Sequence, residues 1–293
     1  MNLSILLTGK AFLPEAYAYK QYLMARGWDV KLCPPGKPEY QADLVISFQP
    51  ERLPDLSSYR CRVIHEYHSL PTGSFPRIRQ FIKKSLTRRP NGRIFLSPIV
   101  RSELRFQDDV PFINRDMGVD DAFFHDNVVS KEFDIVYCGS IEGRTGIIEC
   151  IDDLAKMGLR ILIVGQPTVE FMAKFDTISN ICMIGPLPRE RVPLVIRRAR
   201  YGLNFTPDIY PLNIQTSTKT LEYLAAGLGV ISSRYKWAED FFVDGNKPVI
   251  WLDTLFDRNI NLPDQLDKVD MSAYRWSRIL EGADFEAFLR SLV

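Results

Sequence analysis

Short apolar runs and segments of helical periodicity alternate along the first part of the chain. The apolar runs cover 3–8, 28–33, 43–48 and 62–67, and a helical pattern covers about 14–26. Strands that alternate with helices are typical of βαβ units, and strands that are apolar almost throughout are typical of a parallel sheet buried on both faces. The first part therefore predicts a Rossmann-like, doubly wound α/β domain.

A second series of the same kind follows a polar stretch without periodicity at about 120–131. Its predicted strands are 133–140, 159–166, 180–187, 201–207 and 229–233, and its predicted helices are 146–157, 189–200 and one that begins near 216–218. The final segment again has apolar residues at helical spacing. We therefore expect two Rossmann-like domains, at 1–126 and 127–272, and a C-terminal helix at 273–293.

The composition fits two packed domains and argues against some partners. The 293 residues are 46% hydrophobic, which is sufficient for two cores. Lys and Arg total 37 against 36 acidic residues, so the net charge of +1 argues against a uniformly basic nucleic-acid binder. The stretch 60–105, however, contains eleven Lys and Arg against two acidic residues, a local charge of +9. One segment of the chain is therefore strongly cationic.

The cysteines and the N-terminal residues indicate a cytoplasmic protein. The five cysteines are an odd number without C-x-x-C spacing, so they predict reduced core residues rather than a disulfide framework or a metal site. The opening MNLSILLTGK has no basic leader and predicts a first strand, not a signal peptide. No apolar stretch approaches the ~20 residues of a membrane span. We expect any membrane contact to be peripheral, at the inner face of the membrane.

The helix that begins in TSTKTLEYLAAGLG carries candidate binding residues. Its apolar stripe begins at Leu221, whereas Lys219 and Glu222 lie on a second face with Thr218. A helix N-terminus presents free N–H groups and a partial positive charge, so it suits a phosphate, to which Lys219 adds a full charge. Glu222 can accept hydrogen bonds from vicinal hydroxyls such as those of a ribose. A solvated lysine–glutamate pair is the structural alternative.

Four stretches of the chain together carry a resemblance to a known family. They are VPFINRDMGVDDAFF at 110–124, FDIVYCGSIEGRTGI at 133–147, GPLPRERVPLVIRRARYGLNFTP at 185–207 and TKTLEYLAAGLGVISS at 218–233. In combination they resemble GT-B glycosyltransferases of the large retaining family of bacterial polysaccharide and lipopolysaccharide enzymes (glycosyltransferase family 4-like). The resemblance implies two Rossmann-like domains facing a cleft, with the C-terminal helix crossing back to the first domain. It also implies a nucleotide-diphosphate sugar as co-substrate, for which we expect a UDP-sugar, without cofactor or metal.

The resemblance also assigns donor-binding residues by position. Glu222 matches the glutamate that holds the nucleotide ribose, and Lys219 matches a lysine found in a subgroup of the family. The other implied contacts are the diphosphate-binding backbone of Ser217 and Thr218, the facing loop at Gly139 and Ser140, and the base-reading position Leu187. Ile214 replaces a usual glutamate, and Ser140 replaces an arginine whose charge Arg144 could supply. Whether transfer inverts or retains the stereochemistry therefore stays open.

The end of the strand at 62–67 holds candidate catalytic residues. The run VIHEYHSLPTGS contains His65, Glu66 and His68, where this family tends to keep a histidine near the sugar. Histidine suits proton transfer near neutral pH, and ligands bind at the carboxyl ends of parallel strands. Because alternation sends His65 and Glu66 to opposite faces, we expect His68, just beyond the strand, to act as a base or sugar contact. Hydrogen-bonded histidines at a polar strand end are the structural alternative.

A basic segment at 74–89 predicts an anionic partner. Apolar residues at helical spacing are surrounded there by six cations without an acidic residue, namely Arg77, Arg79, Lys83, Lys84, Arg88 and Arg89. A basic amphipathic helix is typical of membrane-surface binding, so we assign these cations to an acceptor or membrane contact. A core-packed helix with a charged solvent face is the structural alternative.

These observations predict a glycosyltransferase that moves a sugar from a nucleotide-diphosphate sugar to a glycan, lipid-linked or other anionic acceptor in polysaccharide biosynthesis. Two alternatives stay open. A nucleotide-sugar 2-epimerase of the same fold would need carboxylates in the cleft and no acceptor site. A nucleic-acid-directed protein, either a DNA glycosyltransferase or a non-enzymatic binder, would use the basic 60–105 segment to follow phosphates.

Overall fold

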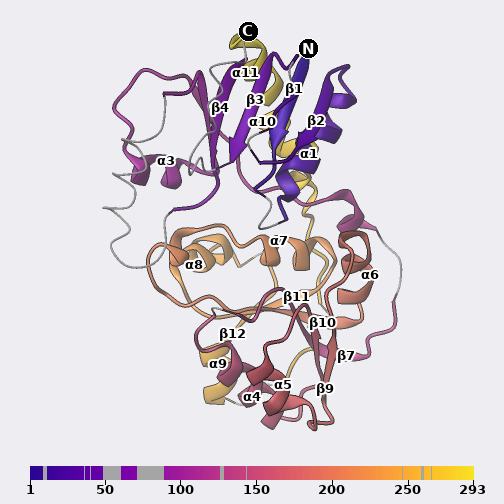
Figure 1. Ribbon diagram of the computed structural model, residues 1–293. Coiled ribbons are helices and arrows are strands. Elements are labelled where there is room, and N and C mark those ends of the chain that lie inside the picture. The colour runs from indigo at the N-terminus through magenta and orange to yellow at the C-terminus, as the bar shows by residue number, and fades with distance from the viewer. Residues whose placement is uncertain are drawn as a thin grey trace. The chain divides into compact units, whose positions relative to one another are not determined.

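Two units, each built on one parallel sheet with helices, make up the chain (Figure 1). The computed structural model describes residues 1–8, 12–35, 37–39, 41–48, 61–70, 89–125, 129–142, 144–245, 247–258, 261–264 and 266–293. Unit 1 comprises Met1–Asp120 with Ala273–Val293, and unit 2 comprises Asp121–Ser272. Each sheet has six strands, so the predicted pair of Rossmann-like α/β units is confirmed.

The sheet of unit 1 has the strand order β2-β1-β3-β4-β5-β6, and all neighbouring strands are parallel. Its elements include β1 Asn2–Leu6, α1 Pro14–Met24, β2 Asp29–Cys33, β3 Leu44–Phe48, β4 Arg62–Tyr67, β5 Gly92–Phe95, α3 Pro98–Leu104 and β6 Phe112–Asn114. The apolar β3 is buried at every position, whereas the edge strand β2 has exposed and buried positions. The sequence pattern predicted the first four strands, but not the short β5 and β6.

The C-terminal segment packs within unit 1. It forms α10 Trp276–Gly282 and α11 Phe285–Ser291, drawn in yellow in Figure 1; α10 contacts α1, and α11 contacts β6. Trp276 lies so close to Gly118 that a Cβ atom on this glycine would come within 2.4 Å of the indole. The return to the first unit is therefore confirmed. The segment is two helices rather than one, because Asp284 has a left-handed backbone conformation (φ 48°) between them.

The sheet of unit 2 has the strand order β12-β11-β10-β7-β8-β9 and is also parallel throughout. Its elements include β7 Phe133–Cys138, α4 Ile147–Lys156, β8 Ile161–Val164, α5 Val169–Phe175, β9 Ile181–Ile184, α6 Val192–Ile196, β10 Ala199–Asn204, α7 Thr218–Ala225, β11 Gly229–Ser232, α8 Lys236–Phe242, β12 Val249–Trp251 and α9 Leu252–Arg258. The predicted helix at 189–200 is wrong in extent, because residue 199 already belongs to β10.

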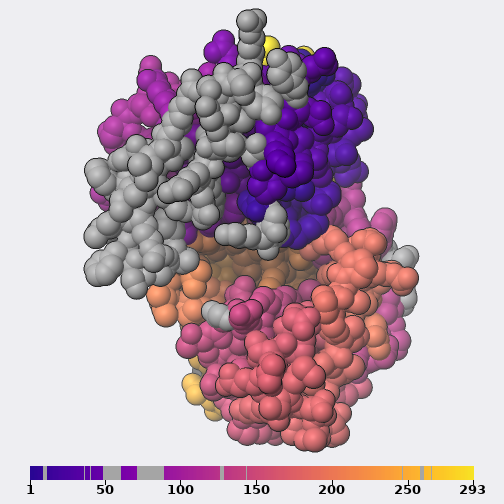
Figure 2. Space-filling model, in the orientation of Figure 1, coloured from indigo at the N-terminus to yellow at the C-terminus, as the bar shows by residue number. Residues whose placement is uncertain are grey.

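The core of unit 2 forms where α4 and α5 cover the sheet. Ile147, Ile151 and Leu154 of α4 are buried, as are Phe171 and Phe175 of α5. The spacing of four and then three residues along α4 puts its apolar side chains on one face of that helix. In the space-filling view, the visible surface of unit 2 is formed largely by the segment that carries α4, α5 and α6 (Figure 2).

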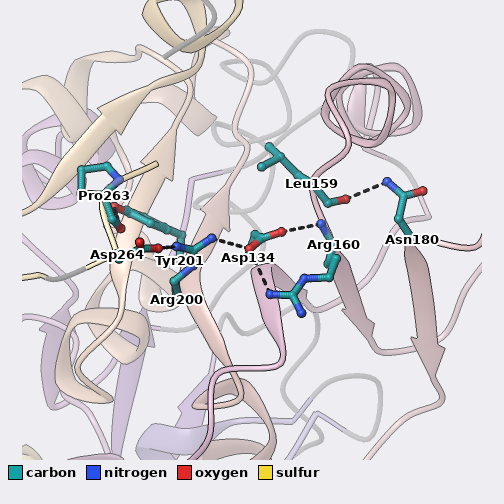
Figure 3. A network of polar contacts seen from close by, with 8 residues as sticks. All are labelled: Asp134, Leu159, Arg160, Asn180, Arg200, Tyr201, Pro263 and Asp264. Atoms are coloured by element: carbon teal, nitrogen blue, oxygen red, sulfur yellow. Dashed lines mark hydrogen bonds and ion pairs between the residues drawn. The ribbon is translucent and has the colours of Figure 1, made fainter. Parts of the chain in front are cut away.

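A polar network joins the amino ends of the strands in unit 2 (Figure 3). The buried Asp134, at the start of β7, accepts a hydrogen bond from the backbone N–H of Arg160 (2.7 Å) and forms an ion pair with Arg200. Asn180 Nδ2 donates to the carbonyl of Leu159 at 2.8 Å. Because these residues precede or begin their strands, the network fixes the amino ends of β7, β8, β9 and β10 relative to one another.

Candidate active site

The start of α7 is held by a buried polar network at the carboxyl ends of β10 and β11. Ser217 is the N-cap of α7: its hydroxyl oxygen accepts from the backbone N–H of Thr220 at 3.3 Å and donates to Asn204 Oδ1 at 2.9 Å. Asn204 Nδ2 donates in turn to the hydroxyls of Ser232 and Tyr235, both at 3.0 Å. The hydroxyl of Ser217 is therefore engaged in capping and positioning the helix.

The middle of α7 is fixed against β10 and β7 by one aromatic side chain. The Tyr223 ring covers the backbone of Gly202, where a Cβ atom would come within 2.1 Å of the ring. The Tyr223 hydroxyl accepts from the backbone N–H of Cys138 at 2.9 Å. These contacts bring the first turn of α7 to the loop that follows β7, which contains Gly139 and Ser140.

Lys219 and Gly139, both predicted as donor-binding residues, lie in contact. Lys219 Nζ donates to the Tyr137 hydroxyl at 3.2 Å and lies 4.4 Å from the centroid of that ring. Gly139 has φ 139°, and a Cβ atom there would come within 2.6 Å of Lys219 Cε. Only glycine fits this conformation and this approach. The Tyr137 hydroxyl also donates to the Ser140 carbonyl at 2.7 Å, which fixes the rest of the loop.

The charges at this end of the sheet are not balanced locally. Burial and, after it, the positive charge of Arg144 lower the pKa of Lys219 to about 7, against the opposing effects of Cys138 and Glu222. Arg144 follows the same loop and is partly buried. Lys219 therefore loses its proton readily in the ligand-free protein, and an anion bound here would restore the charged form.

Glu222 lies one turn further along α7 and already has a basic partner. Its side chain is buried and forms an ion pair with Arg189, whose guanidinium lies 4.8 Å from the Phe123 ring. Arg189 follows the predicted base-reading position, the partly buried Leu187, by two residues. Sequence reasoning did not identify Arg189, because no periodic pattern distinguishes it from Arg191 in the same short run.

The remaining predicted donor positions surround the start of α7. Thr218 is the first residue of the helix and is partly buried, and Ser140 is exposed. Ile214, which stands where the resembling family has a glutamate, ends a short 3-10 turn at Leu212–Ile214. The structure thus brings Lys219, Gly139 and the Ser140 loop together at the carboxyl end of β7.

His65 and Glu66 both lie inside unit 1, on opposite faces of β4. His65 Nδ1 lies 3.5 Å from the Tyr67 hydroxyl, and burial together with Arg93 lowers the pKa of His65 to about 3. Glu66 accepts from the hydroxyl of Tyr19 at 2.9 Å on the other face. Both side chains are 0% exposed, so neither meets bulk solvent.

Glu66 belongs to a buried ionic cluster that the sequence did not reveal. It forms an ion pair with Arg115, which is 1% exposed and also lies 3.9 Å from Glu15. Burial raises the pKa of Glu66 to about 7 although Arg115 acts in the opposite direction. Burial disfavours the charged form of Arg115, but the neighbouring acidic groups outweigh it and raise the pKa of Arg115. The cluster joins α1, β4 and the residue after β6, so it holds the carboxyl edge of this sheet together.

His68 differs from the other two candidates in its exposure. Its side chain is 25% exposed, and its Nδ1 lies 3.7 Å from Oε1 of the buried Glu15. Burial lowers the pKa of His68, while Glu15 raises it. The imidazole is therefore largely neutral at pH 7, with one nitrogen toward a carboxylate. A neutral histidine in this setting can accept a proton.

Most of the basic segment lies outside the described residues. This applies to Arg77, Arg79, Lys83, Lys84 and Arg88. Arg89 is described; it is exposed and forms an ion pair with Asp109. In the described ranges, no helix is long and apolar enough to cross a membrane, and no group of His, Cys, Asp and Glu side chains is arranged to hold a metal ion.

Comparison with known proteins agrees with this architecture. Residues 144–283 match the family model described as Glycosyl transferase-like. Its span covers most of unit 2 and continues into α10. Two parallel Rossmann-like units with a returning C-terminal segment define the class: this chain has the GT-B glycosyltransferase fold, and its second unit is similar to the glycosyltransferase-like family. A search of curated protein sequences found no match.

Three solved structures share the whole fold. AviGT4, a glycosyltransferase involved in avilamycin A biosynthesis, is 15% identical with a TM-score of 0.66, and the match covers 100% of this chain and 98% of AviGT4. Alr3699/HepE of Anabaena, solved with UDP-glucose, is 10% identical with a TM-score of 0.62 and coverages of 100% and 98%. T4 phage BGT, solved with its UDP-glucose substrate, is 14% identical with a TM-score of 0.59 and coverages of 100% and 99%.

Proposed function

We propose that this chain transfers a sugar from a UDP-sugar to a glycan, lipid-linked or other anionic acceptor. The observation that carries the proposal is the unbalanced cationic site at the start of α7, where Lys219 contacts Gly139 and faces the charge of Arg144. Such a site suits the diphosphate of a nucleotide sugar. HepE and BGT, which share the fold, were both solved with UDP-glucose, and this supports UDP as the nucleotide.

In this proposal, unit 2 holds the donor. The N–H groups at Ser217 and Thr218, the Lys219 ammonium and Arg144 bind the diphosphate, while the backbone at Leu187 faces the base. Glu222 exchanges part of its contact with Arg189 for hydrogen bonds from the ribose hydroxyls. When the bond between the sugar C1 and the diphosphate oxygen breaks, negative charge accumulates on UDP. The cations stabilise that charge, which lowers the barrier.

His68 of unit 1 is the proposed base. It takes the proton of the acceptor hydroxyl as the acceptor oxygen bonds to the sugar C1 and UDP leaves. The partial exposure of His68 and the nearby Glu15 carboxylate support this role over His65 and Glu66, which are fully buried. A neutral imidazole is the reactive form, so turnover should rise with pH and level off. Since the pKa of His68 is lowered, the midpoint should lie below the ordinary value of about 6.5.

The test begins with a thermal-shift panel of nucleotide sugars, followed by NMR analysis of the products. We expect UDP-sugars to stabilise the protein and to yield UDP and free sugar, or a glycosylated acceptor. Donor consumption with formation of only the 2-epimer of the UDP-sugar would instead identify a 2-epimerase. Failure of every nucleotide sugar to bind, with tight binding of DNA, would favour the nucleic-acid alternative.

His68→Ala tests the proposed base, with the exposed His125→Ala as the matched control. The change at His68 should reduce turnover by about a hundredfold while the donor dissociation constant stays within about threefold, as expected for a group that acts in the transition state. His125→Ala should leave both quantities unchanged. Unaltered turnover of His68→Ala at saturating acceptor would remove His68 from the mechanism.

A further inference from the structure

A second cationic site, a pocket, lies in unit 1. Its volume is about 320 Å³, and its lining includes Arg93, Phe95, Arg101, Arg105, Phe106 and Phe112. These residues come from β5, α3 and the segment that leads into β6. Residues 105–111 precede β6, whereas His68 follows β4. Because parallel strands begin at one edge and end at the other, much of this pocket lies toward the edge opposite His68.

The inner wall of the pocket is an arginine whose charge is already neutralised. Arg93 is 4% exposed and makes two hydrogen bonds to Asp108, of 2.5 and 2.7 Å. Its guanidinium also lies 3.8 Å from the centroid of the Phe106 ring. Within the described part of the chain, the buried Nε of Arg93 has no hydrogen-bond partner. The wall therefore offers one unused donor without adding net charge.

The outer wall carries two arginines whose charges are not neutralised. Arg101 and Arg105 are exposed, and neither has a carboxylate partner among the residues that the structure describes. The guanidinium of Arg101 lies 4.0 Å from the centroid of the Phe112 ring. Stacking of this kind restrains the guanidinium and leaves its N–H groups free at the edge, in the fork that suits a phosphate.

Arg105 occupies a position that normally favours another residue. It ends α3 with φ 49° and ψ 49°, the left-handed conformation in which helices usually carry glycine or asparagine. A long side chain gives no conformational advantage there, although the partial negative charge at a helix C-terminus favours a cation. The position also sets Arg105 beside Arg101 in the lining of the pocket.

We propose that this pocket binds the phosphate group of a phosphomonoester. Arg101 and Arg105 together match its double negative charge, and the concave shape suits a terminal phosphate rather than the bridging phosphates of a nucleic acid. The ester is either a soluble metabolite or the headgroup of a lipid such as phosphatidic acid. The proposal does not depend on glycosyl transfer, because the proposed donor site belongs to unit 2.

The full-length protein with Arg101→Gln and Arg105→Asn tests the pocket. Lys31→Gln with Arg278→Gln is the control, since it removes the same charge from exposed positions of unit 1. The probes are inorganic phosphate, glycerol 3-phosphate and a short DNA duplex in calorimetry, and phosphatidic acid vesicles against phosphatidylcholine vesicles in sedimentation. We expect the pocket variant to lose at least about tenfold in affinity, since the loss of one charge-assisted contact alone accounts for that much, and the control to match wild type. Asparagine tolerates the left-handed conformation, so the variant should fold at least as stably as wild type.

Each outcome decides something about the pocket. Loss of phosphate and glycerol 3-phosphate binding without a vesicle effect identifies a soluble ester, and loss of phosphatidic acid binding alone identifies a lipid. Equal losses of affinity in the pocket and control variants would show that binding depends only on the net charge of the protein, and this would overturn the proposal. Absence of binding to every probe would overturn it as well, as would binding of a short DNA duplex alone that depends on Arg101 and Arg105.

Discussion

Charges are balanced at the amino ends of the strands in unit 2 and unbalanced at their carboxyl ends. At the amino ends, Asp134 is buried and matched by Arg200 and the backbone of Arg160, so the charges cancel (Figure 3). At the carboxyl ends, Lys219 faces a second cation, Arg144, and burial together with that charge lowers the pKa of Lys219 to about 7. The first arrangement stabilises the fold. The second costs stability, and such sites are typical of places where a ligand supplies the missing charge.

The largest effect should be a loss of stability when the charge-balanced network at the amino ends of the strands is disrupted. Asp134→Ala leaves the N–H of Arg160 without its acceptor and leaves Arg200 with only the exposed Asp264 as a partner. Removal of one partner of a buried pair costs about 3–5 kcal/mol of unfolding free energy, and because Arg200 keeps Asp264 we expect about 3 kcal/mol. Asp253→Ala, which breaks the exposed pair with Arg234, is the control and should cost about 1 kcal/mol or less. Urea titration measures both. Equal losses in the two variants would show that the amino-end network contributes no more to stability than an exposed ion pair.

The next largest effect should be a loss of nucleotide-sugar affinity when the residues at the carboxyl ends of the strands are changed. Lys219→Ala and Glu222→Gln should each weaken UDP-glucose binding by about tenfold or more, because each removes a charge-assisted contact. Lys156→Ala, an exposed lysine of α4, is the control and should bind like wild type. Isothermal titration calorimetry provides the dissociation constants. Wild-type affinity in both site variants would refute the donor site.

An effect of comparable size and opposite sign should appear in stability. The pKa of Lys219 is lower in the folded than in the unfolded protein, so between about pH 7 and 10 the unfolded state binds more protons and wild-type stability rises with pH. The penalty is fully present below pH 7. Lys219→Met removes it and should stabilise the protein by roughly 1–3 kcal/mol at pH 7. Destabilisation by this change, measured in urea, would mean that Lys219 serves the fold.

The sequence predicted the parts of the fold that depend on neighbouring residues. Apolar runs such as 43–48 identified the central strands, because burial on both faces leaves no polar positions. The start of α7 was also predicted, because it depends on residues that are neighbours in the sequence: Ser217 caps its own helix. The three-residue β6 and β12 are too short to show a period, and they were missed.

Residues whose role depends on distant partners could not be found in this way. Arg115 pairs with Glu66, which is 49 positions earlier in the chain, and Arg189 pairs with Glu222, which is 33 positions later. No local pattern records such pairs. Sequence periodicity placed His65, Glu66 and His68 together at a strand end. It could not predict that, of these three, only His68 is partly exposed, because exposure depends on distant parts of the chain.

The most direct test of the donor site is the pH dependence of UDP-glucose affinity, measured by calorimetry between pH 6 and 8.5 in buffers of different ionisation enthalpy. Below pH 7, Lys219 is charged with and without ligand, so affinity should be constant. Above pH 7, the diphosphate must restore the proton to Lys219, so affinity should fall by up to about tenfold per pH unit, with uptake of nearly one proton at pH 8.5. Lys219→Met should show neither effect. Wild-type affinity that is independent of pH over this range, without proton uptake, would contradict the account.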